Sequence, residues 1–587
     1  MENEELRSYA TGWRSTFLRR SLIALLVVST MIQLFANVEY EGLRERIHVQ
    51  TDKKVYLAGE QIRMKLLTVD AEHLPLRLST VAYTELVDDS VGHIQTIVAL
   101  TSGIGESQMQ LPADMPSGFY RLIAYTQLMR NEGAAIFFET VVGVINPFQQ
   151  DYYPQFVEAE TSNTPIAQQQ NPSGSITLQT NKPVYTTREH GELFIAGLPE
   201  NMHTLSVTIA GEDLIDLHSD GETATIHGKR FSLVDKSTES SPDNRKYLPE
   251  FEGHILTGRI VDNQTGQLVS EPNLKTGLTF PGEGLHYFPG QPTESGEIRF
   301  ITAGIAGTEN IATIVYDSDD KYRVDIVSPF VSHFTPKAMP ALSIDTSRYQ
   351  QLLARSVAMQ ASHYFSDNSS AKRVVGESIY KIKPTNSYLL DEYTRFPTMR
   401  EVFIEFISNA RFERQYDKWA LSVVVNTDIN SYYGAKSLVL LDGVHISNHE
   451  FILNYNPALI KQINIYTKRC NFGGELFDGI VELFSYPEHM QDVDFGKSIQ
   501  IIPYKLPQIF DPSPVPDYTN EANRNNWMPD TRHTLLWEPA VRTAGQTTLR
   551  IPFDTSDLKG AYQVTVEGVT FDGAFVNTTT AFSVGEF

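Results

Sequence analysis

Cysteine is almost absent from this chain, which has one thiol, Cys470, in 587 residues. A single cysteine excludes an intrachain disulfide, a cysteine-rich zinc site and a CxxC redox pair. Basic side chains are also in deficit, because 48 Lys and Arg stand against 71 Asp and Glu and leave a net charge of −23. A charge of this size repels phosphate backbones, so we expect no nucleic-acid partner.

A long apolar run occurs near the N-terminus. Arg14, Arg19 and Arg20 precede residues 21–36, which read SLIALLVVSTMIQLFA. This run is short for a membrane span and suits a secretory signal, so residues 1–36 are predicted to be a signal peptide or a retained N-terminal anchor. An exported acidic chain without disulfides favours the bacterial cell envelope, in the periplasm or at the outer membrane.

The rest of the chain is rich in alternating apolar and polar residues, the pattern of half-buried strands. The segment from Thr51, TDKKVYLAGEQIRMKL, aligns with the segment from Thr180, TNKPVYTTREHGELFI, at an offset of 180 − 51 = 129 residues. A period of this length is too long for a solenoid and indicates two copies of one domain type. Strands at regular spacing up to about residue 148 predict a β-sandwich.

The same residues carry a family resemblance. The pattern TDK-x-VY-x-x-GE-x-I at 51–62, with PSGFYRL at 116–122, resembles the macroglobulin-type β-sandwich domains of α2-macroglobulin-like proteins, particularly their second domain. Protease traps of that family act through a thioester built on Cys-Gly-Glu-Gln, whereas Cys470 is followed by Asn-Phe-Gly. The resemblance therefore implies the sandwich fold without the thioester trap.

The second half of the chain mixes further strands with two helices. Residues 256–269 and 293–300 alternate around turns and resemble a small carboxypeptidase-regulatory-like sandwich. Residues 346–365 and 398–410 have helical spacing of apolar residues. Five prolines predict a connecting region at 502–526, followed by strands of a C-terminal sandwich.

The stretch from Ser437 to Tyr486 carries a second resemblance. Its LVLLDGV, NPALIKQINIYT, FGG and GIVEL segments, after FPTM and the helix at 398–410, resemble the plug domain of TonB-dependent outer-membrane receptors. Only 587 − 486 = 101 residues follow, whereas a 22-stranded barrel needs more than about 220. The resemblance thus implies a recognition module without a pore of its own. Its predicted partner-binding residues are Asp442, Gly443, Val444, Phe472, Gly473 and Gly474.

These patterns predict a mainly β, multidomain chain with tandem macroglobulin/Ig-like β-sandwiches, one small α/β plug-like domain and a C-terminal β-sandwich. The predicted domains after the N-terminal segment are a first sandwich at 45–148, a second at 174–248, a regulatory-like sandwich at 250–335, a helical connector at 345–385, the plug-like domain at 388–486, and a linker with the last sandwich at 487–587.

Two groups of residues could carry metal chemistry, and each has a simpler reading. His445 and His449, with Glu450, have a spacing that zinc accepts on a helical turn, but the same residues suit a polar loop. Asp317, Asp319 and Asp320 offer oxygen ligands for calcium, or form a solvated turn. We assign no catalytic, cofactor or metal site to either group.

The function predicted from these features is that of a non-enzymatic envelope protein, a binding or accessory component of an outer-membrane assembly, with any small-molecule ligand unknown. The alternative is a macroglobulin-like protein that interacts with proteases without a thioester, with residues 150–174 as its bait by composition. A third reading, a carbohydrate-active or other hydrolase, has only unplaced carboxylates in its favour.

Overall fold

The computed structural model describes residues 44–585, in which strands predominate over helices. The residues that it leaves out are 1–43, 89–91, 153, 158–175, 220–221, 227–228, 234–245, 270–273, 283, 294, 317, 366–381, 416, 426–435, 488–492, 511–514 and 586–587. The predicted export segment at 1–36 thus lies outside the described residues, as does most of the bait candidate. Within the described part, no helix is long and apolar enough to cross a lipid bilayer. The prediction of a mainly β, multidomain chain is confirmed.

The first sandwich is one sheet with the order β1-β3-β6-β5-β4-β7-β8-β2, antiparallel except where β2 runs parallel to β8. The sheet folds over itself, since β1 also contacts β7 and β8. Alternating residues such as Ile62, Met64 and Leu66 fill the core between the layers. Its strands are β1 (Glu45–Thr51), β2 (Val55–Leu57), β3 (Gln61–Asp70), β4 (Val81–Val87), β5 (Gly92–Thr101), β6 (Ile104–Gln110), β7 (Gly118–Tyr125) and β8 (Phe138–Ile145).

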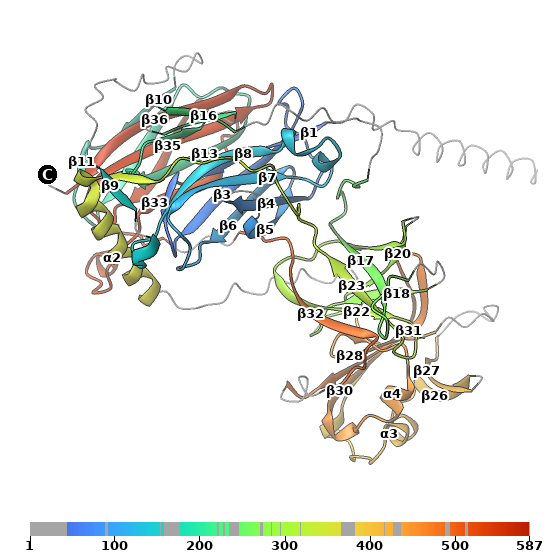
Figure 1. The fold of residues 1–587 in the computed structure, drawn as a ribbon. Coiled ribbons are helices and arrows are strands. Elements are labelled where there is room, and N and C mark those ends of the chain that lie inside the picture. The colour runs from blue at the N-terminus through green and yellow to red at the C-terminus, as the bar shows by residue number, and fades with distance from the viewer. Residues whose placement is uncertain are drawn as a thin grey trace, which may run out of the picture. The chain divides into compact units, whose positions relative to one another are not determined.

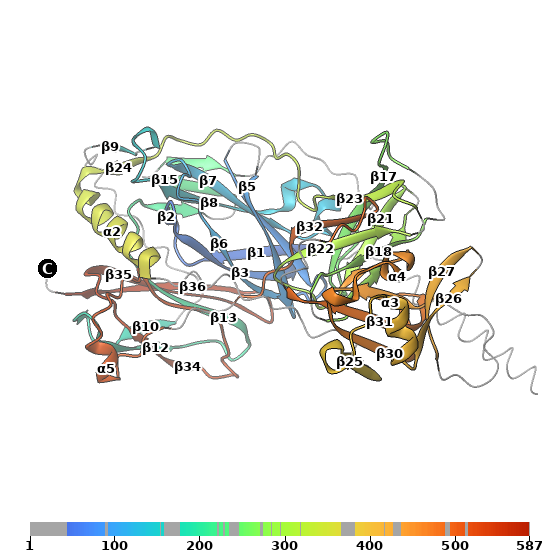
Figure 2. The same ribbon diagram turned by 90° about the horizontal axis from the view of Figure 1, so that it is seen from below.

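The second sandwich is assembled from two distant parts of the chain. One sheet has the order β10-β12-β34 and the other β11-β36-β35-β13-β33, and Figures 1 and 2 show these green and red strands side by side. The first part supplies β10 (Thr177–Thr180), β11 (Val184–Tyr185), β12 (His190–Ala196) and β13 (Met202–Gly211). The second part supplies β33 (Thr534–Val541), β34 (Thr548–Asp554), β35 (Gly560–Thr570) and β36 (Phe575–Val584).

This pairing corrects the predicted division into separate sandwiches at 174–248 and 487–587. β13 has β33 on one side and β35 on the other, so neither half has a complete sheet without the other. The apolar side chains of both halves also enclose one core, in which Leu205, Val207, Val564 and Val566 are fully buried. The second sandwich is therefore one discontinuous domain, and the residues between 211 and 534 are inserted between its two parts.

The third sandwich is also completed by a strand from far along the chain. Its sheets have the orders β20-β21-β17-β23 and β19-β18-β22-β32. β32 contains Pro503 and belongs to the predicted connecting region, but it lies at a sheet edge, where proline's missing N–H breaks no ladder. The strands are β17 (His254–Asp262), β18 (Thr276–Thr279), β19 (Tyr287–Pro289), β20 (Gln291–Pro292), β21 (Glu297–Thr302), β22 (Thr308–Val315), β23 (Tyr322–Val327) and β32 (Ile499–Lys505).

An α/β domain lies within the third sandwich's sequence, between β23 and β32. Its mixed sheet has the order β25-β30-β31-β28-β29. The helices α3 and α4 cover one face of this sheet, with Val439, Leu441 and Ile463 beneath them. The elements are β25 (Asn386–Leu389), α3 (Met399–Glu405), β26 (Ala410–Gln415), β27 (Lys418–Val423), β28 (Leu438–Leu441), β29 (Val444–His445), α4 (Glu450–Leu453), β30 (Ile460–Phe472) and β31 (Glu475–Ser485).

The predicted helix at 398–410 ends earlier than expected. Thr398 and Glu401 form a capping box that begins α3, and α3 ends at Glu405. The chain then turns into β26, so the apolar Ile407 packs in the domain core from outside the helix.

Residues 328–365, which we call the strap, run from the third sandwich along the first sandwich. The strap contains β24 (Ser343–Asp345), which pairs in parallel with β9 (Gln155–Val157), and α2 (Tyr349–Phe365), close to the predicted helix at 346–365. Its buried Leu342, Ile344 and Leu352 pack on β2, β7, β8 and the small sheet β14-β15-β16. That sheet consists of β14 (Leu217–Ser219), β15 (Thr223–Ile226) and β16 (Lys229–Ser232). The remaining short helix, α5 (Glu521–Arg524), follows β32.

Candidate functional site

The Asp442-Gly443 turn joins β28 to β29 with left-handed backbone at both residues, φ +48° and +78°. This is the conformation of a tight I′ hairpin turn, which Asp-Gly favours. The Asp442 carboxylate accepts hydrogen bonds from the Ser485 N–H and hydroxyl, both at 2.7 Å. The carbonyl oxygen of Asp442 accepts from the N–H of Gly282 at 2.8 Å, which fixes the turn against the third sandwich.

Gly443 leaves no space at this contact. A Cβ added there would lie 2.4 Å from the carbonyl oxygen of Phe280 and 2.9 Å from that of Gly282. Glycine is therefore required twice, by its positive φ and by the close approach of two backbones. The turn is a docking point between two domains of the same chain.

The second face of the α/β sheet packs on the third sandwich. Phe472 and Phe477 contact Tyr287 of β19 edge to face, with ring centroids 5.5 and 5.2 Å apart. The Tyr287 hydroxyl donates to the Glu475 carboxylate at 2.5 Å and also contacts the Tyr316 hydroxyl. Burial, with Tyr316 and Glu475 nearby, raises the pKa of Tyr287, so its hydroxyl keeps its proton. An apolar contact with a hydrogen-bonded polar edge holds the two domains together.

These contacts correct the predicted partner-binding residues. Asp442, Gly443, Val444 and Phe472 are buried inside the chain, so they are not available to another protein. Gly473 and Gly474 are exposed at the tip of the β30–β31 hairpin, and only they keep the predicted accessibility. A turn motif indicates a sharp corner but not what packs on it, and here a distant domain occupies the corner.

The two histidines whose spacing would suit zinc make contacts within the fold. His445 lies in β29 among the rings of Tyr287, Tyr316 and Phe477, where burial lowers the pKa of the imidazole to about 3. His449 Nδ1 accepts a hydrogen bond from the Leu421 N–H at 2.9 Å. Across the described residues, no group of three or more His, Cys, Asp and Glu side chains is placed to hold a metal ion.

The acidic turn at 317–320 is also occupied by the chain itself. Asp317 lies outside the described residues, Asp319 pairs with Lys418 at 3.3 Å, and Asp320 Oδ1 accepts from the N–H groups of Lys497 and Ser498, both at 2.9 Å. The thiol of Cys470 is buried, and burial raises its pKa, which disfavours the nucleophilic thiolate.

An aromatic surface lies on the α/β domain near the end of α3. Tyr393 stacks on Phe406 with ring centroids 4.4 Å apart, and Phe396 lies 6.2 Å from Phe406. Tyr393 is exposed, and Ile404 of α3 is 65% exposed. We call the contacting rings of Tyr393, Phe396 and Phe406, together with the exposed Ile404 two positions before Phe406 in the sequence, the aromatic edge. Aromatic and aliphatic side chains left partly open to solvent are typical of protein contact surfaces.

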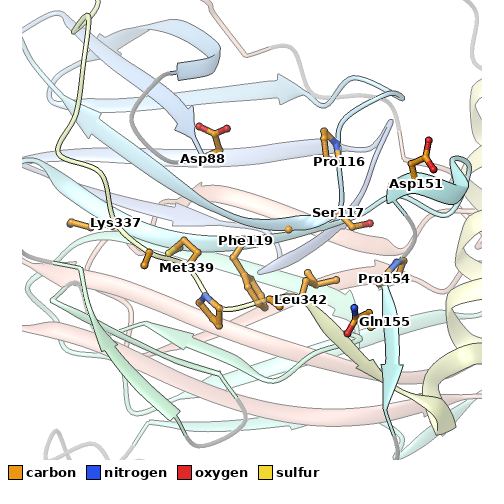
Figure 3. A pocket seen from close by; sticks show the side chains of 14 residues that line it. Asp88, Pro116, Ser117, Phe119, Asp151, Pro154, Gln155, Lys337, Met339 and Leu342 are labelled. Carbon is orange, nitrogen blue, oxygen red and sulfur yellow. The ribbon is translucent and has the colours of Figure 1, made fainter.

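A groove of about 660 Å³ lies between the strap and the first sandwich. Figure 3 shows Phe119 of β7 with Met339 and Leu342 of the strap at its centre. Two of its three charged lining residues are paired, since Asp88 contacts His93 at 2.7 Å and Lys337 contacts Glu139 at 2.8 Å, while the third, Asp151, is exposed. The groove therefore offers apolar contact more than acid–base chemistry.

A cluster of buried charges lies where α2 meets the first sandwich. Glu60 accepts two hydrogen bonds from Arg355, at 3.0 and 2.7 Å, and one from Lys53 at 2.9 Å. Burial alone raises the pKa of Glu60, but Arg355 and Lys53 outweigh it and hold the pKa below its ordinary value. Nearby, burial raises the pKa of Asp213 to about 6.

Lys53 and Glu60 belong to the repeated motif, and both copies of that motif form the same local structure. Tyr56 donates to Asp52 and Lys53 pairs with Glu60 in the first copy, as Tyr185 donates to Asn181 and Lys182 pairs with Glu189 in the second. In each copy the Thr hydroxyl donates to the Lys carbonyl, Thr51 to Lys53 at 2.7 Å and Thr180 to Lys182 at 2.8 Å. The repeat seen in the sequence therefore stabilises the same turn in both sandwiches.

The fold and these surfaces define a multidomain β-sandwich protein with an inserted α/β domain. No family model and no curated protein matches the sequence. Among solved structures, trypsin-activated alpha-2-macroglobulin from Escherichia coli is 10% identical over 93% of this chain and 42% of that chain, with a TM-score of 0.23. Salmonella alpha-2-macroglobulin reacted with methylamine is 10% identical over 93% and 40%, at 0.23. Dimeric latent PorU from Porphyromonas gingivalis is 12% identical over 52% and 34%, at 0.14.

The chain thus spans less than half the length of the macroglobulins that it matches. These TM-scores carry no functional argument, and the architecture rests on the strand pairing described above. Sequence reasoning missed the groove, the aromatic edge and Arg355. A signal for Arg355 was present, because a charged residue stands between Leu352 and Ala358 on the buried face of α2.

Proposed function

We propose that this chain is a non-enzymatic protein of the bacterial cell envelope that presents its α/β domain to an outer-membrane protein or assembly. The observation that carries the proposal is the way in which the α/β domain is attached to the third sandwich. One face of its sheet is fixed on the third sandwich through Gly443, Phe472 and Glu475, and the other face is covered by α3 and α4. A domain held in this way keeps a rigid outer surface, which favours recognition over movement.

The aromatic edge is the surface proposed to meet the partner. Tyr393 and Ile404 expose large apolar groups, while the neighbouring Met399, Val402 and Phe403 anchor α3 in the core. Rigid aromatic side chains bind a partner at a small cost in conformational entropy. The resemblance of residues 388–486 to a plug domain and the predicted N-terminal export segment support an outer-membrane partner.

Site-specific photo-crosslinking in cells tests this proposal. A photoreactive phenylalanine analogue at Tyr393 is compared with the same group at Phe571, an exposed aromatic residue of the second sandwich. We expect Tyr393 to yield a discrete adduct with an outer-membrane protein that Phe571 does not yield. Identical adducts at both positions, or none at Tyr393, would contradict the proposal.

A charge substitution provides the matching loss-of-function measurement. Ile404→Asp places a carboxylate on the aromatic edge without touching the buried face of α3, so folding is preserved and partner recovery falls at least about tenfold. The control is Val184→Asp, an exposed apolar residue of the second sandwich. Equal recovery with both variants would place the partner surface elsewhere.

A further inference from the structure

The strap is fastened to the first sandwich at several points along its length. The carbonyl oxygen of Pro329 accepts hydrogen bonds from Gln127 and Arg130, at 2.9 and 2.7 Å. Farther along, Lys337 pairs with Glu139 at 2.8 Å. The last contact is made by Arg355 of α2, whose guanidinium reaches Glu60 and the carbonyl oxygen of Val55, at 2.8 Å from the latter.

α2 itself is held by little apolar packing. Its well-buried apolar side chains are Leu352 and Ala358, while Tyr349, Leu353 and Val357 face solvent at intervals of four residues. A helix that exposes a whole apolar stripe gains little from burial, so its docking depends on other contacts. Arg348 and Gln351 bond to Glu212 at the helix start, but the Arg348–Glu212 pair is open to solvent and such pairs contribute little. Arg355, which is 3% exposed, makes the buried charged contact of α2.

The second copy of the motif shows which contacts the hydrogen-bonded turn needs in order to form. There Glu189 is held by Lys182 and Thr186, and the turn forms with the same hydrogen bonds as the first copy. The Lys–Glu pair is thus sufficient for the motif. Arg355 is an addition to the first copy, and its role is to hold α2.

The added contact is also imperfect. Arg355 Nη1, Asp213 Oδ1 and His533 Nδ1 are buried without a hydrogen-bond partner, and all three belong to the same charge cluster. Buried polar groups without partners offset part of the stability that an ion pair supplies. The net stability that the cluster gives to the docked state of α2 is therefore smaller than the ion pair alone would give.

We propose that the strap is a releasable device: Arg355 latches α2 onto the first sandwich, and loss of this buried contact frees α2 while both large sandwiches stay folded. Release exposes Val55 and Leu57 of β2 and opens the groove at Met339 and Leu342 from its α2 end. This inference does not depend on the identity of any envelope partner.

Hydrogen exchange measured by mass spectrometry on the full chain tests the latch. In Arg355→Met we expect amides of β24 and α2 to exchange at least about 100-fold faster, because breaking a buried pair is strongly destabilising, while β35 and β36 keep their protection. Arg355→Lys keeps the charge but loses the paired hydrogen bonds, and we expect an increase of about tenfold.

Two controls separate a latch from a general loss of stability. Leu353→Ala changes an exposed residue of the same helix, and Lys182→Met breaks the ion pair in the second copy. Neither is expected to alter exchange in α2. The proposal is overturned if α2 keeps its protection in Arg355→Met, if exchange rises equally throughout the sandwiches, or if this variant does not fold.

Discussion

Replacement of Gly443 by alanine is expected to loosen the α/β domain from the third sandwich. The new methyl group would lie 2.4 Å from the Phe280 carbonyl oxygen, well inside normal contact distance. The oxygen cannot turn away freely, because the Gly282 N–H, two residues on, is bonded to Asp442 at 2.8 Å. Loss of that hydrogen bond costs about 1 kcal/mol, and alanine at a φ of +78° adds about 1–2 kcal/mol of backbone strain.

With the displacement of two packed backbones, the total expected for Gly443→Ala is about 3–5 kcal/mol. Gly474→Ala is the matched control, because Gly474 also has a positive φ, +94°, but no atom lies within 4 Å of its added Cβ. Strain alone then predicts about 1–2 kcal/mol.

The assay is amide exchange of the slowest amides in β30 and β31, which report on opening of the whole domain. A difference of about 2 kcal/mol between the two variants corresponds to roughly 30-fold in exchange rate. Equal rates in Gly443→Ala and Gly474→Ala would refute the reasoning, because they would show that the interdomain contact contributes nothing.

Three further predictions concern charge and burial. Glu60→Gln is expected to lower the free energy of unfolding by about 3 kcal/mol, because the first Lys–Glu pair is buried. Glu189→Gln is expected to lower it by less than about 1 kcal/mol, because the second pair is partly exposed. Urea unfolding measures both changes, and equal effects would contradict the prediction. The folded pKa of Asp213, about 6, lies above its ordinary value of 3.8, so its stabilisation is complete at low pH and is lost as pH rises through 6. Between pH 5 and 7 the wild type should therefore lose about 1 kcal/mol of stability that the Asp213→Asn variant does not lose. Amide exchange in β2, corrected for the intrinsic exchange rate, measures this loss. Parallel pH profiles of the two proteins would count against the prediction. Tyr287→Phe should weaken the α/β junction by about 1–3 kcal/mol in the same exchange assay, and unchanged protection of β19 would show that the bond to Glu475 is dispensable.

The local elements of this fold follow from sequence, because each is set by residues within a short stretch. Alternation predicts β1 and β3, and the capping box of Thr398 and Glu401 begins α3. The repeat at Thr51 and Thr180 also has a local cause, since the hydrogen bonds described for both copies join residues two to seven positions apart.

The arrangement of the domains does not follow from sequence. β13 pairs with β33 and β35, more than 300 residues away, and no local pattern marks that choice. Pro503 predicts a break in regular structure because proline lacks the N–H that a ladder needs, yet β32 accommodates it at the edge of its sheet. Asp442 and Gly443 specify a turn, and only the folded chain reveals that Phe280 and Gly282 cover it. The exposed candidate surface is therefore the aromatic edge and not this turn.

The discontinuous second sandwich cannot form until the C-terminal part of the chain has been synthesised. Between the end of β13 at Gly211 and the start of β33 at Thr534 lie 534 − 211 = 323 positions. At about 5–20 residues per second, a ribosome needs roughly 16–65 s to add them. Throughout that interval β13 lacks both of its neighbouring strands, β33 and β35, although its Leu205, Val207 and Ile209 are fully buried in the finished fold. We therefore expect the N-terminal part of the second sandwich to need protection from aggregation until the C-terminal strands have been made.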